Sequence, residues 1–326
     1  MTSFKKSNLK NILSMALFLL LVLLLAFYVW QNREDMLKML RLSPSVIWGM
    51  LLLGLGGGII NCFYHLAILR THPISLSLAD WMGVVSVSNA IAYVLPLRAD
   101  LVFTAAYYKR VKGLAYTKSV SMAAGNILFG IAFSLLQIAV SLLCIGLIEG
   151  SWPGLLWGLW LLGILALDLI VFCALGMKGK LPGFLARFRL LQSVLEGFTD
   201  LLRNRSLLFQ VLCCLVLNNL CQLFLYSLCF RSIGMPIPLY MTLFYNSVSW
   251  LIGIVAIVPG NIGIKESVMG AATLLLGSVF QTGFAVSLLQ RVVMLIVHMV
   301  MGLVFALPVY TRFTKSAPQE NPSSLP

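Results

Sequence analysis

The chain alternates between long apolar runs and short polar segments that carry most of its basic residues. A helix needs about 20 mainly apolar residues to cross the hydrocarbon core of a bilayer. Six runs meet this criterion, and each is predicted to be a spanning helix: 12–30, 46–69, 119–148, 154–176, 207–230 and 284–311. The pattern therefore predicts an all-α integral membrane protein with about six spanning helices.

Two further apolar stretches, 81–97 and 240–258, do not fit this pattern. The first runs into Leu95-Pro96-Leu97-Arg98-Ala99-Asp100, and the second into Val258-Pro259-Gly260-Asn261-Ile262-Gly263-Ile264-Lys265-Glu266. Proline removes a backbone donor and breaks the interior of a helix. We therefore expect a break in the backbone near each proline.

The distribution of lysine and arginine orients the helices, because basic residues gather in cytoplasmic loops. Three lie near the N-terminus, five in 98–118 and six in 177–206, whereas 149–153 has none and 231–239 has one. They are Lys5, Lys6, Lys10, Arg98, Lys109, Arg110, Lys112, Lys118, Lys178, Lys180, Arg187, Arg189, Arg203, Arg205 and Arg231. We therefore predict a multi-pass protein of the cytoplasmic (inner) membrane, with both termini cytoplasmic.

With this orientation, each of the two unusual stretches begins and ends on one side of the membrane. Both are then predicted to be re-entrant hairpins, at about 81–112 and about 240–277. Non-helical backbone at membrane depth is tolerated only where it is buried in protein or lines water. We therefore expect neither break to face lipid.

The two parts of the chain follow the same order of elements, in opposite orientation. Ser86-Val87-Ser88 begins ten residues before Pro96, and Ser247-Val248-Ser249 begins twelve residues before Pro259. Paired interrupted segments in two halves are typical of inverted-repeat transporters. The sequence predicts a first repeat over 1–150 and a second over 151–315. The Pro/Ser-rich tail, 316–326, is predicted to be disordered.

Composition agrees with a membrane protein. The chain is 60% hydrophobic and 10% charged, with a mean hydropathy of +0.97, against about 25% charged residues in a soluble domain. Its net charge is +13, from 23 basic and 10 acidic residues. In a soluble protein this excess would suggest nucleic acid, but here it lies in the short loops, so we expect no nucleic-acid partner.

Five charged residues near the breaks or within the last span are the candidate site: Arg98, Asp100, Lys265, Glu266 and Arg291. Ionisable groups at membrane depth are costly and are by default functional candidates. In one interpretation, internal ion pairs (Arg98 with Asp100, and Glu266 with Lys265 or Arg291) only hold the broken helices. In the other, the three cations hold a lipid phosphate, for which arginine is well shaped, while the carboxylates set their geometry or carry a proton.

The residues expected to form the breaks are Pro96, Pro259, Gly260 and Gly263. The glycines would let the backbone approach a ligand closely, and a helix that restarts near Gly263 would aim N–H groups at an anion. The same glycines could equally serve the turn alone.

Five further residues are expected to act between the helices. We expect Gly54 and Gly58 to allow tight packing, and Asp168 to pair within the bundle or line a water cavity. Asn218 and Asn219 are expected to form interhelical hydrogen bonds.

Metal and hydrolytic chemistry have little support in the sequence. His65, His72 and His298 are spread along the chain and form no clustered ligand set. No Gly-x-Ser-x-Gly nucleophile elbow is present. We therefore expect no enzyme activity, no catalytic residues, no metal and no cofactor.

The segments around Pro96–Asp100 and Pro259–Glu266 resemble two signatures of the lysylphosphatidylglycerol synthase transmembrane-domain family, and Arg291 before a glycine-containing last span resembles a third. This family includes the flippase part of the bacterial multiple peptide resistance factor. The resemblance implies lipid translocation with paired re-entrant elements at the centre, and Arg98, Asp100, Glu266 and Arg291 as the functional set. Lys265 and Asn261 depart from the family pattern, which usually has Arg and a more Gly-rich run there. We also expect no cytosolic aminoacyl-transfer domain.

The leading hypothesis is a flippase or scramblase for an anionic phospholipid or lipid-linked conjugate. Two alternatives stay open: a secondary transporter of a small anionic solute, and a non-catalytic membrane partner of a glycosyl- or aminoacyl-transferase. The expected partners are a membrane lipid with an anionic head group and, in the last alternative, the membrane-associated transferase. A homo-oligomer is a further open alternative.

Overall fold

The computed structural model describes residues 43–70, 74–95, 98–176, 205–254 and 261–316, and these residues form helices and no strand. Five helices are long and apolar enough to cross a membrane. They are α3 (Pro44–Leu69), α6 (Tyr116–Glu149), α7 (Gly154–Gly176), α9 (Arg205–Ser232) and α12 (Phe280–Lys315). These helices match five of the six expected spans to within a few residues. The expected span 12–30 and almost all of the tail lie outside the described residues.

Shorter helices lie between the long ones, where the sequence predicts broken segments. The first group is a π-helical turn, η1 (Ala79–Gly83), followed by α4 (Val84–Val94) and α5 (Ala99–Lys112). The second is α10 (Leu239–Ile254) and α11 (Ile264–Leu275). Helix α4 gives way to extended backbone at Leu95, the conformation that a following proline favours. Of the four residues expected to form the breaks, Gly263 directly precedes α11, and Pro96, Pro259 and Gly260 lie outside the described residues.

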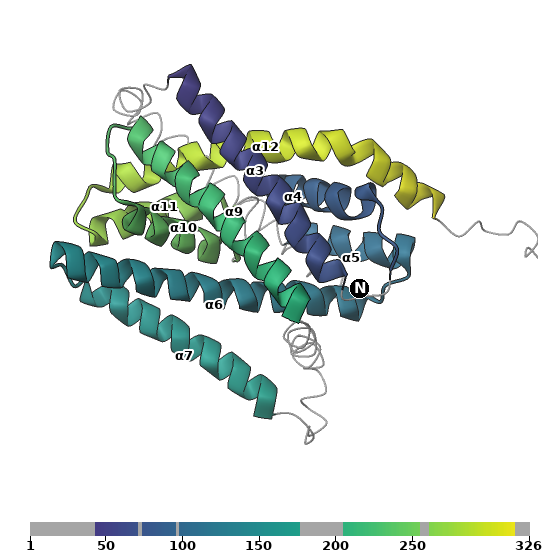
Figure 1. The fold of residues 1–326 in the computed structure, drawn as a ribbon, viewed down its shortest axis with the longest axis horizontal. Helices are drawn as coiled ribbons and strands as arrows, with labels where there is room; N and C mark the ends of the chain where they lie inside the picture. Colours follow the sequence, from purple (N-terminus) through teal and green to yellow (C-terminus); the bar gives the residue numbers. More distant parts are fainter. Residues whose placement is uncertain (1–42, 71–73, 96–97, 177–204, 255–260, 317–326) are drawn as a thin grey trace, which may run out of the picture.

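The two groups of short helices enter the bundle from opposite ends. In Figure 1, α4 and α5 occupy one half of the long axis, and α10 and α11 occupy the other. Helices α3 and α9 pack against each other, α4 packs on α12, and α10 packs on α6. One helix of each short-helix pair therefore packs on a long helix from the other part of the chain, while its partner packs on a long helix of its own part, α5 on α6 and α11 on α12.

Glycines allow these close helix contacts. A Cβ added to Gly54 or Gly58 of α3 would meet side chains of α12, including the sulfur of Met301 at 2.9 Å from position 58. Between α11 and α12 the fit is tighter, because a Cβ at Gly283 would lie 2.3 Å from the carbonyl oxygen of Met269. The expected packing role of the glycines in α3 is therefore confirmed.

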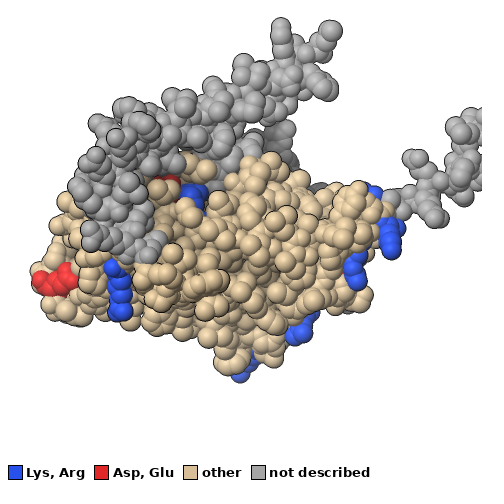
Figure 2. Space-filling view, turned by 90° about the horizontal axis from the view of Figure 1, so that it is seen from above, with Lys and Arg blue, Asp and Glu red and all other residues tan. Residues whose placement is uncertain are grey.

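Much of the outer surface is apolar, as a lipid-facing surface requires. Most of the face seen in Figure 2 is uncharged, and its charged side chains lie mainly near its ends and edges. Helix α7 packs on α6 and leaves most of its leucines exposed, among them Leu159, Leu162 and Leu165. Asp168 is also exposed on α7. The prediction that Asp168 pairs inside the bundle is therefore wrong for the residues that the structure describes.

Candidate functional site

Two adjoining cavities lie where the two pairs of short helices meet. The larger has a volume of about 460 Å³ and the smaller about 230 Å³; ligand pockets typically measure about 300–1,000 Å³. Tyr93, Arg98, Asp100, Ser249 and Gly253 line both cavities. Since these residues are shared, the two cavities are adjacent parts of one site.

The smaller cavity lies between the two breaks. From the first break it is lined by Leu95, Arg98 and Asp100, and from the second by Asn261 and Lys265, with Arg291 of α12 completing it. The structure thus brings four of the five predicted site residues to one cavity. The fifth, Glu266, is fully buried beside Arg291.

Arg98 adopts an uncommon backbone conformation, with φ of 57° and ψ of 38°. A non-glycine residue in this left-handed region costs about 1–2 kcal/mol, and such strain is concentrated at functional sites. Its guanidinium Nη2 lies 3.4 Å from Oδ2 of Asp100. Its Nε is buried and has no hydrogen-bond partner among the described residues. The Arg98 side chain therefore keeps hydrogen-bonding capacity beside the cavity.

Asn261 occupies the same left-handed region at the second break, with φ of 53°. Its side-chain amide donates a hydrogen bond of 2.8 Å to the carbonyl oxygen of Ile252 in α10. Asparagine tolerates this conformation better than most residues because its short side chain bonds locally. The hydrogen bond ties the segment before α11 back to α10.

Glu266 and Arg291 form a buried ion pair that holds the start of α11. Nε of Arg291 lies 2.5 Å from Oε1 of Glu266, and the two side chains are 8% and 0% exposed. The other carboxylate oxygen of Glu266 accepts a 2.8 Å hydrogen bond from the backbone N–H of Gly263, and Arg291 also donates to the carbonyl oxygen of Asn261. These contacts favour a structural role for the pair. The N–H of Gly263 is used by Glu266 and is therefore not one of the N–H groups that the start of α11 could direct at an anion.

Lys265 differs from Arg291, because no described carboxylate lies within ion-pair distance of the Lys265 amine. Its Nζ donates a 2.8 Å hydrogen bond to the amide oxygen of Gln290 and lies 6.0 Å from the centre of the Tyr226 ring. Both contacts position the amine and supply no carboxylate partner. The pairing of Glu266 with Lys265, one of the two alternatives from the sequence, is not the one observed.

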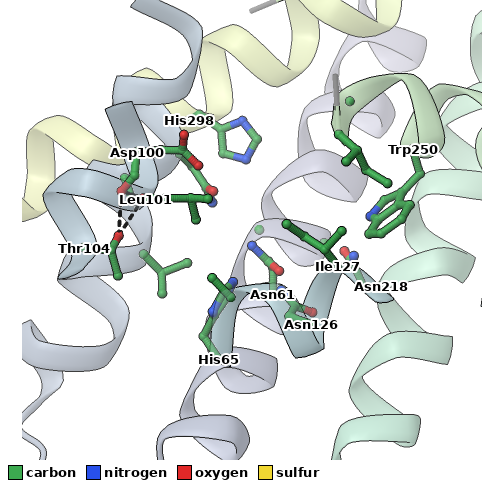
Figure 3. Close-up of a pocket in the computed structure, with 18 of the residues that line it drawn as sticks. Asn61, His65, Asp100, Leu101, Thr104, Asn126, Ile127, Asn218, Trp250 and His298 are labelled. Atoms are coloured by element: carbon green, nitrogen blue, oxygen red, sulfur yellow. Dashed lines mark hydrogen bonds between the residues drawn. The ribbon is translucent and has the colours of Figure 1, made fainter. Parts of the chain in front are cut away.

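The larger cavity has a wall rich in neutral polar groups. Figure 3 shows Asn61, Asn126 and Asn218 around a common space, with His65 and His298 at its edges. Asn89, Gln222, Asn246 and Gln290 add further side-chain amides. Sequence reasoning missed most of these residues, because each is a single amide within an apolar run. Asn218 and Asn219 were both expected to form interhelical hydrogen bonds; the prediction is confirmed for Asn219, whose amide oxygen accepts a 2.9 Å hydrogen bond from Asn246 of α10.

Comparison with known families agrees with this architecture. A model of the family described as "Lysylphosphatidylglycerol synthase TM region" matches residues 11–302 of the chain. The chain belongs to this family. The match confirms the family that the segments around Arg98 and Glu266 indicated, and with the five long apolar helices it supports a multi-pass membrane protein. No curated protein and no solved structure matches the chain.

This member of the lysylphosphatidylglycerol synthase TM-region family also has a buried charge cluster at one end of the bundle, which the sequence did not predict. Asp80 of η1 is fully buried and lies 2.7 Å from Nζ of Lys112 and 3.3 Å from Nη1 of Arg312. The hydroxyl groups of Tyr107 and Tyr108 donate to its side chain and its backbone carbonyl, respectively. Asp80 thus joins the start of the first short-helix group to α5 and to the end of α12.

Substitution of Asp80 by asparagine is expected to reduce the free energy of unfolding by about 3 kcal/mol near neutral pH, because it leaves the Lys112 amine without its buried partner. Burial raises the pKa of Asp80, but hydrogen bonds from Lys112, Ser77 and Tyr107 outweigh it, and the pKa falls from 3.8 to about 2. A depressed carboxylate pKa stabilises the fold above the unfolded pKa. The difference from wild type should therefore be constant above about pH 5 and shrink as the pH falls toward about 2.

Thermal unfolding in detergent across this pH range measures the effect. Glu149→Gln is the matched control, since it converts an exposed carboxylate at the end of α6 to an amide whose oxygen can still accept the hydrogen bond from Tyr240. A difference between wild type and Asp80→Asn that does not change with pH would show that the charge of Asp80 does not stabilise the fold.

Proposed function

We propose that the protein is a flippase or scramblase that moves an anionic phospholipid or lipid-linked conjugate between the leaflets of the cytoplasmic membrane. One observation carries this proposal. Two pairs of short helices enter the bundle from opposite ends and meet at a cavity lined by Arg98, Lys265 and Arg291. Such a cavity would bind a phosphate at the middle of the membrane, where both leaflets have access through motion of the surrounding helices.

The proposed membrane topology makes each short-helix pair a re-entrant hairpin. The longest of these helices, α10, has 16 residues, which at 1.5 Å per residue is about 24 Å and shorter than the hydrocarbon core of about 30 Å. Basic residues mark the cytoplasmic end of the bundle. They include Lys109 and Lys112 in the last turn of α5 and Arg312 and Lys315 in the last turn of α12.

Equivalent serines in the two groups support an inverted repeat, with 1–150 and 151–315 as its units. Ser86 and Ser247 are both fully buried, and each donates to the carbonyl four residues earlier, of Met82 and Leu243. Ser88 and Ser249 both line the larger cavity. The reciprocal packing of α4 on α12 and α10 on α6 fits the same relation.

In the proposed mechanism, Arg98 and Lys265 hold the lipid phosphate, while Glu266 and Arg291 keep the start of α11 in place. A guanidinium forms paired hydrogen bonds to phosphate oxygens, and an ammonium supplies a compact charge. Rocking of one hairpin and its long helix against the other would expose the cavity to one leaflet and then to the other. The acyl chains would stay in the membrane throughout, so no covalent step and no cofactor is required.

Lipid translocation in proteoliposomes tests the proposal. The purified full-length protein is reconstituted with head-group-labelled phosphatidylglycerol, and loss of outer-leaflet label to a membrane-impermeant quencher is followed over time. We expect faster exchange than in protein-free liposomes, loss of that exchange in Arg98→Gln, and retention in Arg70→Gln, which changes an exposed arginine at the end of α3. Rates equal to protein-free liposomes for several anionic lipids would overturn the proposal.

The two alternatives make different predictions in the same system. A transporter of small anionic solutes would accumulate a soluble organic phosphate inside the liposomes and leave labelled lipid in place. A membrane partner of a transferase would move neither, and Arg98→Gln would leave the activity of the associated transferase unchanged. The smaller cavity adjoins the larger polar cavity and shares five lining residues with it, which leaves room for a head group beside the phosphate and supports a lipid as the ligand.

A further inference from the structure

The wall of the larger cavity differs in chemistry from that of the smaller one. Its polar side chains include seven amides, from α3, α4, α6, α9, α10 and α12, together with serine, threonine and tyrosine hydroxyl groups, His65, His298, Arg98 and Asp100; the amides are Asn61, Asn89, Asn126, Asn218, Gln222, Asn246 and Gln290. An amide side chain offers both a hydrogen-bond donor and an acceptor, whereas an ammonium offers donors alone and a carboxylate acceptors alone. The amides and hydroxyl groups of this wall therefore match uncharged polar groups that both donate and accept, such as the hydroxyl groups of a polyol.

Several of these polar groups are available to a ligand. The amides of Asn126, Asn246 and Gln290 already have hydrogen-bond partners. The amides of Asn61, Asn89 and Asn218 make no hydrogen bond to any other described residue. The hydroxyl of Ser119, which lines the cavity and is 9% exposed as a residue, also has no partner in the described part of the chain. Buried polar groups are normally satisfied, so the Ser119 hydroxyl indicates a polar ligand, and the half-buried amides of Asn61, Asn89 and Asn218 are free to bind the same ligand.

The charges of the larger cavity argue against a cationic head group. The acidic residue that lines it is Asp100, whose carboxylate lies 3.4 Å from Arg98. The other buried carboxylates nearby in the fold, Glu266 and Asp80, are each held in an ion pair and do not line the cavity. An ammonium in this space would lack an unpaired carboxylate among the described residues, and a buried charge without a counter-charge is costly.

The two cavities share Arg98 and Asp100, so a phosphate in the smaller cavity would lie next to the amide wall of the larger one. We propose that the lipid is a phosphodiester whose head group is an uncharged polyol: the phosphate binds at Arg98 and Lys265, and the hydroxyl groups bind to Asn61, Asn89 and Asn218. This inference rests on the proposed function and names its substrate class. It excludes as preferred substrate a lipid whose head group carries an amine, such as a lysyl-phosphatidylglycerol.

Direct lipid binding tests the inference independently of transport. The purified protein in detergent is titrated with phosphatidylglycerol, phosphatidylinositol and a polyprenyl-phosphate-linked hexose. Each of these lipids is a phosphodiester with an uncharged polyol head group. Phosphatidic acid serves as the phosphate-only probe, and lysyl-phosphatidylglycerol and phosphatidylserine as the amine-bearing probes. Affinities are measured by native mass spectrometry or by thermal stabilisation. We expect at least one polyol lipid to bind about tenfold more tightly than both amine-bearing lipids, the effect of one or two hydrogen bonds.

Two substitutions at one position sharpen the test. Asn218→Ala should weaken the affinity for the preferred polyol lipid about fivefold and leave the affinity for phosphatidic acid unchanged, because only the contact with the hydroxyl group is lost. Asn218→Asp places a carboxylate in the wall and should invert the preference toward lysyl-phosphatidylglycerol. Gln210→Ala is the control, since Gln210 lies on the same helix, α9, outside the cavity lining, and should change no affinity.

The outcomes separate this inference from the proposed function. Selective binding of a polyol lipid that is not translocated in proteoliposomes would support the substrate class and overturn the flippase proposal. Equal or tighter binding of lysyl-phosphatidylglycerol by the wild-type protein would overturn the inference, whatever the translocation rates. If Asn218→Ala weakens the binding of phosphatidic acid and of the polyol lipid equally, the inference is also overturned. The Asn218 amide would then support the fold and would not bind the hydroxyl groups.

Discussion

Replacement of Arg291 by alanine is expected to destabilise the protein by about 3–5 kcal/mol, because it leaves the fully buried Glu266 carboxylate without its counter-charge. The ion pair is short, at 2.5 Å, and the Glu266 side chain has no exposed area. The same substitution removes the hydrogen bond from Arg291 to the carbonyl of Asn261. Both contacts hold the start of α11, so we expect α11 to lose its structure first.

Thermal unfolding in detergent, followed by intrinsic tryptophan fluorescence, measures the loss. Arg231→Ala is the matched control, since Arg231 is an exposed arginine in the last turn of α9. The double variant Arg291→Met/Glu266→Gln should recover a large part of the stability, because it removes the charges together. If Arg291→Ala unfolds at the wild-type temperature, the ion pair does not hold α11 and a purely functional role of Arg291 becomes the better interpretation.

Replacement of Lys265 by glutamine is expected to slow lipid translocation about 10- to 100-fold, the effect of losing one charge-assisted hydrogen bond of about 1.5–3 kcal/mol. No described carboxylate lies within ion-pair distance of the Lys265 amine, so its removal leaves no buried carboxylate uncompensated. Stability should therefore change much less than in Arg291→Ala. This separation between rate and stability is what distinguishes a ligand-binding cation from a structural one.

The measurement combines the proteoliposome exchange rate with the unfolding temperature of the same preparations. Lys265→Arg keeps the positive charge and should retain a rate within about tenfold of wild type, as the geometry but not the charge changes. Lys118→Gln removes an exposed lysine near the start of α6 and is the control. A rate in Lys265→Gln equal to that of wild type would remove Lys265 from the proposed phosphate site.

The long helices could be predicted from the sequence because each is a nearly continuous apolar run. The same runs contain the positions that the sequence did not reveal. Asn61 and Asn89 are single amides within apolar segments, and they face a common cavity only because α3 and α4 pack together with helices from the other part of the chain. Hydropathy records how apolar a segment is, and it carries no information on which helices meet.

The charged residues near the breaks were found because charge next to a break in an apolar run is rare. Their roles required the geometry. Glu266 lies at the third position of α11, from which its carboxylate reaches back to the N–H of Gly263 and across to Arg291. Asp80 was missed because it stands at the polar edge of an apolar stretch, where a solvated loop is the ordinary expectation. Its partners Lys112 and Arg312 are distant in the sequence, and only the packing of α5 and α12 brings them to it.

The packing of α4 and α10 on long helices that are distant in the sequence also constrains how the protein is made. Helix α4 is complete at Val94, but α12, on which it packs, begins only at Phe280. At translation rates of about 5–20 residues per second, this helix follows about 10–40 s later. Helix α10 can pack as soon as it is made, because α6, on which it packs, precedes it in the chain. The last long helix thus completes the packing of α4, and a nascent chain arrested before Phe280 has α4 without the helix on which it packs.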